Sequence, residues 1–365
     1  MVSFILSAVV LLSALLPVTF AQTHTDCNPL NTTGCPNMPA LGGNASFHFN
    51  STWSSKLWKT TNGKVDQYDD GAKFTIARSG DSPTIASSFY ILFGRVSIVM
   101  KAAPGQGIVS SAILQSEDLD EIDWEFLGSN TTHVLTNYFG KGNTTDYTRG
   151  KEFGTENPQE KFHTYTIDWT KERIQWWVDN NMLRELKYAE ALGGKNYPQT
   201  PMNIRLGIWS GGDVKNNDPG VVAWAGGKTD FDKGPFTMFV RDVYVQDYTT
   251  AKEYSWENMD ASGSFEKVKV INGTSDALTE AHKPHGVKNR WNALSKGVQI
   301  GIISGVLGFV LICIILITIC CVKQRRAGKR EFAALEAEQN KEASELLAYK
   351  QQMASGRFGY GNNRV

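Results

Sequence analysis

The sequence predicts an all-β antiparallel sandwich that is followed by one membrane-spanning helix. Between residues 45 and 270, short runs rich in Val, Ile, Thr, Tyr, Phe and Trp are broken by Gly, Asn, Asp and Pro about every ten residues, which is the spacing of strands and turns. No long amphipathic helical pattern interrupts these runs, and a region of this length fits one sandwich. Further on, residues 298–322 contain no charge.

An apolar N-terminal segment predicts export of the chain. Residues 4–18 read FILSAVVLLSALLPV and are followed by Thr19, Phe20 and Ala21. The segment has no Lys or Arg before its apolar run, unlike most secretory signals. We predict that residues 1–21 are a signal peptide and that the mature chain starts near Gln22.

The cysteines and the glycosylation sequons agree with export. Cys27 and Cys35 are the cysteines that precede the charge-free segment. A close pair in an oxidising compartment predicts a disulfide, because a metal site would need more ligands than this segment offers. The Asn-x-Ser/Thr sequons also lie before the charge-free segment, which predicts a glycosylated luminal or extracellular portion. They are at Asn31, Asn44, Asn50, Asn130, Asn143 and Asn272.

Several runs are clear strand predictions. They cover residues 74–76, 93–100, 109–114, 162–169, 174–179 and 236–245. Alternation in the fourth run places Tyr165, Ile167 and Trp169 together on one buried face. Residues 188–192 predict a short helical turn. His163 is interpreted as a buried or rim histidine with satisfied nitrogens, because it has no nucleophile to serve.

One further run concentrates carboxylates on a single face. Residues 120–126 read DEIDWEF. Successive side chains of a strand point to opposite faces, so Ile122 and its apolar neighbours form a core face. The other face carries Glu121, Asp123 and Glu125, which repel one another and need a reason to be together.

Cleavage of a glycosidic bond supplies such a reason, since it uses one carboxylate and one carboxylic acid. The Cα atoms of Glu121 and Glu125 are about 13 Å apart in a strand. Side chains that lean toward each other bring the carboxyl groups within roughly 6 Å, which favours a retaining double displacement. Asp123 between them would orient Glu121 and bias which neighbour keeps a proton. The same pattern also fits an exposed acidic strand or a cation site.

The motif resembles a known family of enzymes. Residues 121–125 (EIDWE) match the Glu-x-Asp-x-Glu signature of glycoside hydrolase family 16, and residues 120–128 (DEIDWEFLG) are similar to plant xyloglucan endotransglycosylases and fungal Crh-type cell-wall transglycosylases. The resemblance covers most of residues 45–270. It implies a β-jelly roll of the concanavalin A type, within a domain of residues 22–272, and a groove that holds several sugar units.

The resemblance also implies roles for the three acids. Glu121 is expected to be the nucleophile, Asp123 to assist it, and Glu125 to be the acid/base. No cofactor is expected, and no compact oxygen-ligand motif predicts a structural cation.

Substrate-binding candidates come from alternation and from the resemblance. Residues 204–209 (IRLGIW) place Arg205 and Trp209 on one face, where an indole can stack on a sugar ring and a guanidinium can bond its oxygens. The alternative is an amphipathic strand with a half-exposed Trp. Residues 224–231 (WAGGKTDF) resemble a Trp-Ala-Gly-Gly stretch of Crh-type proteins, and residues 136–142 (TNYFGKG) resemble the segment after the catalytic strand, where Asn and Tyr face the cleft. These stretches and the preceding strand add Gln115, Asn137, Tyr138, Trp224 and Thr229.

The C-terminal part predicts a single-pass membrane anchor. Residues 273–297 are interpreted as a polar linker, and residues 298–322 are long enough to span about 30 Å of hydrocarbon. Lys323 and the basic residues after it predict a cytoplasmic tail, residues 323–365, and a type I topology. This basic cluster fits anionic lipid better than nucleic acid, in a chain whose net charge is zero.

Some details of this anchor remain hypotheses. Gly301 and Gly305 could support weak dimerisation, and Cys320 and Cys321 are candidates for acylation. Many Crh-type relatives carry a removed lipid-anchor signal, whereas 43 residues follow residue 322 here. Residues 331–353 are rich in helix formers but too sparse in apolar residues for a firm coiled coil. Residues 356–365 predict a disordered end.

Two classes of function compete for this sequence. One is an enzyme outside the plasma membrane or another secretory membrane, and the other is a membrane-anchored lectin with the same groove. The intact carboxylates favour the enzyme, because a lectin has no use for them. Water as acceptor would give hydrolysis of β-glucan or chitin, and a sugar hydroxyl would give transglycosylation. The resemblance implies transfer of chitin to β-glucan or chitin acceptors in a fungal wall.

Overall fold

The computed structural model describes residues 25–145 and 148–355 of the chain. The chain divides into two compact units, Met1–Asn289 and Arg290–Val365. Each unit is described here by itself. The predicted signal peptide and the predicted disordered end lie outside the described residues.

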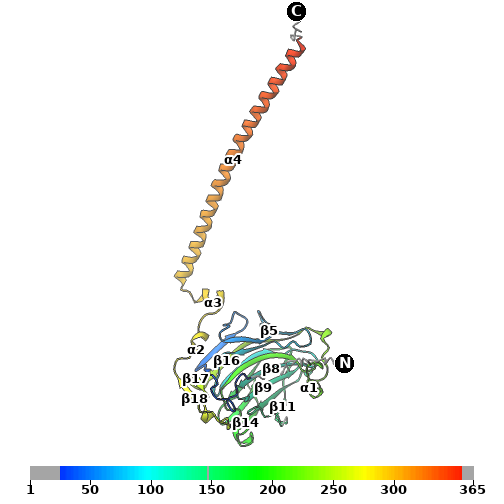
Figure 1. The fold of residues 1–365 in the computed structure, drawn as a ribbon, viewed down its shortest axis with the longest axis vertical. Helices are drawn as coiled ribbons and strands as arrows, with labels where there is room; N and C mark the ends of the chain where they lie inside the picture. Colours follow the sequence, from blue (N-terminus) through cyan, green and yellow to red (C-terminus); the bar gives the residue numbers. More distant parts are fainter. Residues whose placement is uncertain (1–24, 146–147, 356–365) are drawn as a thin grey trace, which may run out of the picture. The chain divides into compact units, whose positions relative to one another are not determined.

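Two large antiparallel sheets make up most of the first unit (Figure 1). The seven-stranded sheet has the order β11(Lys151–Gly154), β10(His133–Phe139), β9(Glu121–Leu127), β8(Ile108–Ser116), β15(Met202–Ser210), β6(Thr84–Ser87) and β3(Trp58–Asn62). The eight-stranded sheet has the order β14(Asn181–Lys187), β13(Arg173–Val178), β12(His163–Trp169), β7(Gly94–Lys101), β16(Phe236–Asp247), β5(Gly71–Ile76) and β4(Val65–Tyr68), with β2(Asn44–His48) also paired to β16. A small third sheet joins β1(Met38–Pro39), β17(Ala251–Ser255) and β18(Lys269–Asn272).

The core is built from alternate residues of both large sheets. Ile122, Trp124 and Phe126 of β9 are fully buried. The ring of Phe126 meets that of Tyr165 from β12 edge to face, with centroids 4.6 Å apart, and Trp169 of β12 is also fully buried. Aromatic rings in such contacts contribute much of the burial that stabilises a sandwich. The predicted antiparallel sandwich is therefore confirmed.

The predicted strands are found, and the strands that the sequence did not indicate are mostly polar edges. The six predicted runs fall in β5, β7, β8, β12, β13 and β16. β11 and β14 each form one edge of a large sheet, and most of their residues are exposed, so they lack the apolar alternation that marks a half-buried strand. The predicted helical turn is present as the 3₁₀ helix η1(Tyr188–Glu190).

The predicted disulfide is also present. Cys27 and Cys35 are joined, with their Cα atoms 5.7 Å apart. Among the sequons, Asn31, Asn44, Asn50 and Asn272 are exposed, whereas Asn130 and Asn143 are half-buried. Glycosylation at these positions stays a prediction.

The predicted linker, residues 273–297, contains a short helix that packs against the core. Ser275 caps α2(Asp276–Ala281) by accepting from the Leu278 amide, and it donates to the carbonyl of Ala40 at 2.6 Å. Leu278 packs against the core, next to Gly43. Few apolar residues carry this contact, which explains why composition indicated a spacer. A further helix, α3, covers Gly286–Ala293.

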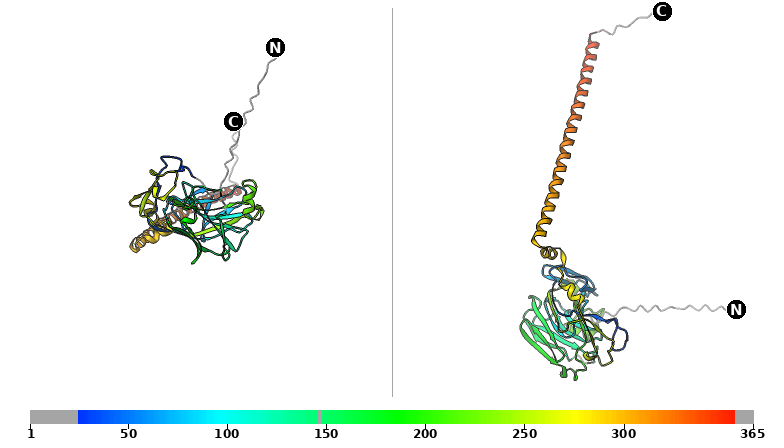
Figure 2. Two further views of the ribbon diagram at one scale, coloured as in Figure 1. Left: turned by 90° about the horizontal axis from the view of Figure 1, so that it is seen from below. Right: turned by 90° about the vertical axis from the view of Figure 1, so that its left-hand side faces the viewer.

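The second unit is dominated by α4(Lys296–Ala354), which has 59 residues. It is drawn as one uninterrupted helix in the right-hand view of Figure 2. Within residues 25–145 and 148–355, it is the one helix long and apolar enough to cross a membrane. The helix continues through the basic cluster and through residues 331–353, whose composition predicted helix.

Candidate active site

The three acidic residues of β9 share one face of the seven-stranded sheet. Directly opposed residues of antiparallel strands point to the same side, and β8 places Gln115 opposite Glu121 and Ser111 opposite Glu125. Because the intervening residues of β9 fill the core, this side faces away from it. We call it the carboxylate face, defined by Glu121, Asp123 and Glu125. The predicted pleat is therefore present.

Burial and mutual repulsion control the protonation of these acids. Glu121 is 9% exposed and accepts from the Gln115 amide nitrogen at 3.3 Å. Burial, the charges of Glu121 and Glu125, and a hydrogen bond with Glu121 raise the pKa of Asp123 well above its usual range. Asp123 is thus held as the acid that donates to Glu121.

Glu125 is perturbed in the direction that a proton donor needs. Burial, followed by the negative charge of Glu121, raises the pKa of Glu125 to about 8. At neutral pH its carboxyl group is mostly protonated. Two carboxyl groups therefore lie on one face of one strand, one of them with a raised pKa, and glycoside cleavage uses such a pair.

The start of β9 is fixed by a buried carboxylate. Asp120 is fully buried. One of its oxygens accepts from the Gln199 amide at 2.7 Å and from the Thr200 hydroxyl at 2.9 Å. The other oxygen accepts from the Lys141 amide at 2.9 Å, and the Lys141 ammonium lies 3.3 Å away. Two distant loops are thereby tied to the residue that precedes Glu121.

The middle of β9 is held from the core side. The indole nitrogen of Trp176 donates to the Asp123 carbonyl at 3.0 Å. The guanidinium of Arg184 lies over the Trp176 ring, 4.8 Å from its centroid, and donates to the carbonyl and hydroxyl of Thr136 on β10. These contacts fix the backbone from which Asp123 projects.

Four of the predicted substrate-binding residues lie on the carboxylate face. The register of β8 and β10 places Gln115 and Asn137 there. Arg205 lies opposite Ile113, and Trp209 lies opposite Val109. The sequence therefore located these side chains relative to the three acids.

Trp224 joins Trp209 although it does not belong to the sheet. It is the last residue of α1(Pro219–Trp224) and is 38% exposed. The two indole rings are stacked, with centroids 6.1 Å apart and an interplanar angle of 23°. Trp209 donates to the Ser111 hydroxyl at 3.3 Å. It also packs on a small apolar cluster, which consists of Val109, Leu127, Leu135 and Ala225. Leu127 is two residues after Glu125 on β9.

Two predicted substrate-binding residues do not face this site. Tyr138 lies opposite Ile122 and is buried in the main core, because the pleat sends it away from Asn137. Thr229 is 2% exposed, and its hydroxyl lies 2.7 Å from that of Ser210. Both predictions are wrong in placing these side chains in the cleft.

The structure adds residues that the sequence interpretation omitted. Asn203 accepts from the Nε of Arg205 at 3.1 Å, so it orients the guanidinium. Ser111 bonds Trp209, as described above. Both positions follow from strand parity, because Asn203 is two residues before Arg205, and Ser111 lies on a predicted strand. The sequence did not select Asn203 and Ser111 because it does not show which strands pair with one another.

Comparisons with known proteins agree with this geometry. Residues 48–226 match the model of glycosyl hydrolases family 16. A Crh-like protein of Arthroderma benhamiae is 47% identical over 350 residues, which are 95% of each chain. Crh-like protein 2 of Botryotinia fuckeliana is 49% identical over 356 residues, covering 95% of this chain and 78% of the relative.

Solved structures point to the same family. The structure "Apo Crh5 transglycosylase" is 48% identical and has a TM-score of 0.64, covering 67% of this chain and 100% of that chain. "Crh5 transglycosylase in complex with NAG" is 49% identical, with the same TM-score, and covers 67% of this chain and 99% of that one. The sandwich is therefore a β-jelly roll with a C-terminal apolar helix, and the chain belongs to the Crh-like proteins of glycosyl hydrolase family 16.

Proposed function

We propose that the chain is a retaining transglycosylase that cleaves chitin and transfers it to β-glucan or chitin acceptors of a fungal cell wall. The observation that carries the proposal is the carboxylate face, where Glu121 and Glu125 project from one strand and the pKa of Glu125 is raised to about 8. The relative that was solved with NAG supports a donor containing N-acetylglucosamine. No feature of the described residues favours hydrolysis or a lectin over transfer.

In the first step, Glu121 attacks the anomeric carbon of the donor. A bond forms between its carboxylate oxygen and that carbon, the glycosidic C–O bond breaks, and Glu125 protonates the leaving oxygen. The raised pKa keeps this proton available at neutral pH. The Asp123 carboxyl donates to Glu121 and fixes the orientation of the attacking oxygen.

In the second step, Glu125 changes from acid to base. The charge of Glu121 is one of the two causes that raise the pKa of Glu125. Glu121 is a neutral ester in the glycosyl-enzyme intermediate, so this cause disappears and the pKa of Glu125 falls. Glu125 can then accept the proton of an acceptor hydroxyl, whose oxygen attacks the anomeric carbon and releases Glu121. Two displacements retain the configuration.

The acceptor is proposed to bind at the Glu125 end of the face. The stacked indoles of Trp209 and Trp224 and the apolar cluster lie at this end. Gln115 and Asn203 are paired at the other end, beside Glu121. An aromatic platform next to the acid/base holds a sugar ring where water would otherwise attack.

Product analysis tests the proposed reaction. The full-length protein in detergent would be mixed with chitohexaose and fluorescently labelled laminarihexaose in H₂¹⁸O, and the products would be measured by mass spectrometry. We expect labelled products that have gained N-acetylhexosamine units. If donor fragments carry ¹⁸O and no labelled hybrid forms, the reaction is hydrolysis and not transfer. Binding without any product would support the lectin.

Replacement of Trp224 tests the acceptor platform. Trp224→Ala is expected to raise the KM for the acceptor about fivefold, with kcat changed less than about twofold, because the exposed ring binds sugar without touching the reacting atoms. Trp177→Ala is the matched control, since Trp177 is half-buried on the outer face of the other sheet. An unchanged KM in Trp224→Ala would remove this ring from the acceptor site.

The proposed location is the outer side of a membrane. We propose a type I topology, with a cleaved signal peptide, one span at residues 298–322 and a cytoplasmic tail. The apolar part of α4, the basic residues that follow it and the disulfide of the first unit support this orientation. Contact with lipid through this span, and weak dimerisation through Gly301 and Gly305, belong to the same proposal.

A further inference from the structure

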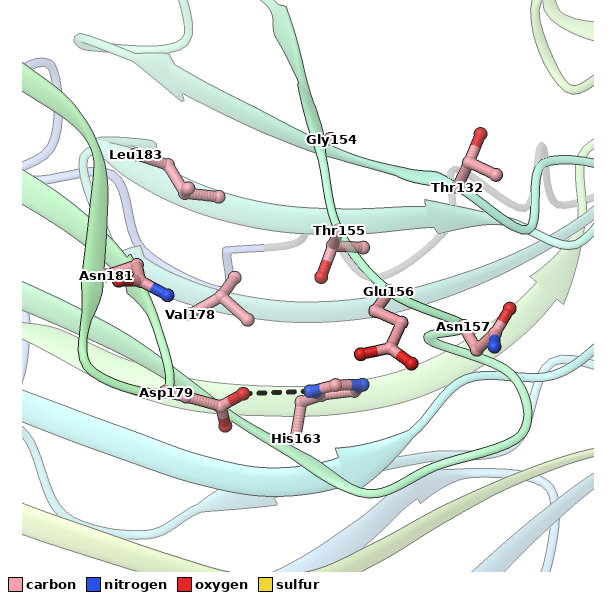
Figure 3. A pocket seen from close by; sticks show the side chains of 10 residues that line it. All are labelled: Thr132, Gly154, Thr155, Glu156, Asn157, His163, Val178, Asp179, Asn181 and Leu183. Carbon is pink, nitrogen blue, oxygen red and sulfur yellow. Dashed lines mark hydrogen bonds and ion pairs between the residues drawn. The ribbon is translucent and has the colours of Figure 1, made fainter.

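A cavity of about 570 Å³ lies where both large sheets end. Gly154 of the edge strand β11 lines one side, and Asn181 and Leu183 of the edge strand β14 line another (Figure 3). The volume is within the range of ordinary ligand sites. None of the residues assigned to catalysis or to substrate binding lines this cavity.

His163 brings a buried polar atom to this cavity. Its Nδ1 lies 2.9 Å from a carboxylate oxygen of Asp179, and the other oxygen of Asp179 accepts from the Thr164 amide at 2.9 Å. An ionised carboxylate only accepts, so Nδ1 is the donor of the bond to Asp179. Figure 3 shows Nε2 on the side of the ring away from Asp179.

The other ring nitrogen is left over in the part of the chain that the structure describes. The Nε2 atom is buried without a hydrogen-bond partner, and the side chain of His163 is 10% exposed. Buried polar atoms are normally bonded, and each exception needs an explanation. A hydroxyl group of a ligand would supply a partner, because it can both donate and accept.

The other lining residues define the class of ligand. Glu156 and Asp179 bring negative charge, which disfavours an anion, and the Lys161 ammonium already pairs with Glu156 at 2.5 Å. Among residues 25–145 and 148–355, no group of His, Cys, Asp and Glu could hold a metal ion. Thr155 and Asn181 add neutral hydrogen-bonding groups.

Apolar surface completes the site. Val178 is buried and Leu183 is half-buried, and both line the cavity. A ligand with many hydroxyl groups and an apolar C–H face matches this mixture of donors, acceptors and aliphatic carbon. Such a ligand is a neutral hexopyranose.

We propose that this cavity is a second saccharide-binding site, separate from the carboxylate face. The choice of a saccharide rests on the proposed function. β11 is two strands away from β9 in the same sheet, about 10 Å at the usual strand spacing. A polysaccharide held at this edge would be kept close to the catalytic acids, which raises the local concentration of substrate.

Photo-crosslinking tests the site directly. The full-length protein in detergent, carrying Glu121→Gln to prevent turnover, would be irradiated with diazirine-labelled chitotriose or laminaritriose, and the labelled peptides would be identified by mass spectrometry. We expect labels on peptides that contain residues 154–157 or 178–183, in addition to peptides from the carboxylate face. Excess unlabelled trisaccharide should remove both sets of labels.

Matched variants separate binding from folding. His163→Phe keeps an aromatic ring and removes both ring nitrogens, so labelling at the cavity should fall about tenfold. His48→Phe is the control. His48 lies on β2, and its Nδ1 is likewise close to an aspartate oxygen, that of Asp242 at 2.6 Å. If His163→Phe fails to fold, Asn181→Ala at the exposed rim should reduce the same labels.

The outcomes distinguish this site from the proposed function. Labels confined to the carboxylate face, or cavity labels that persist in His163→Phe and Asn181→Ala, would overturn the second site. Absence of hybrid products in the transfer assay would contradict the proposed reaction and would leave the cavity labels unaffected.

Discussion

Glu121→Gln is expected to reduce transfer between oligosaccharides by on the order of 10⁴-fold or more, as loss of a covalent nucleophile does in other enzymes. The amide keeps the volume of the side chain and can still accept from Gln115, which bonds Glu121 at 3.3 Å. It cannot form the glycosyl ester. The initial rate of labelled product formation, at saturating donor and acceptor, measures this effect.

An activated substrate and a matched variant control this result. An aryl glycoside with a good leaving group should not rescue Glu121→Gln, because the missing group is the attacking one. Glu185→Gln makes the same substitution at an exposed residue of β14, where Glu185 accepts from Gln175, and should leave the rate unchanged. Substantial activity of Glu121→Gln on either substrate would assign the nucleophile elsewhere.

The sequence predicted the central strand because a pleat is a local property. Three acids alternate with three apolar residues, so the two faces of β9 could be assigned without knowing any partner strand. The same logic placed Arg205 and Trp209 correctly. The prediction for Tyr138 was wrong because it assigned two adjacent residues of one strand, Asn137 and Tyr138, to the same face, which the pleat forbids.

Contacts between distant segments could not be predicted in this way. Asp120 bonds the amide of Gln199, which is 79 residues further along the chain, and no local pattern records such a pair. Thr229 was a candidate from the stretch that resembles Crh-type proteins, and the fold buries it against Ser210. The α2 helix was missed because its packing against the core uses few apolar side chains, those of Ala277, Leu278 and Ala281.

The cavity at the sheet edge shows the same limit. His163 was interpreted as a satisfied histidine, and its Nδ1 does bond Asp179. The orphaned Nε2 depends on the approach of β11, β12 and β14, and two of these strands are polar edges that the sequence did not indicate. Edge strands carry weak sequence signals, so a site built on them is visible only in the folded chain.

Glu125→Gln is expected to separate substrates by their leaving groups. Oligosaccharide donors should lose about 10²- to 10⁴-fold in rate, because their leaving oxygen must be protonated. Aryl glycosides with good leaving groups should still form the glycosyl-enzyme, since they depart without a proton. Added azide should then accelerate turnover, because an anionic nucleophile needs no base. Equal loss on both substrates would contradict the role of Glu125.

The pH dependence of the unsubstituted enzyme should also reveal the role of Glu125 as proton donor. Burial and the charge of Glu121 raise the pKa of Glu125 to about 8, so the proton donor is intact below that pH and is lost as the pH rises through it. The kcat/KM for oligosaccharide donors should therefore fall on the alkaline side with an apparent pKa near 8. In Glu125→Gln, the kcat/KM for aryl glycosides should lack this alkaline limb. A limb that persists in the variant would show that another group supplies the proton.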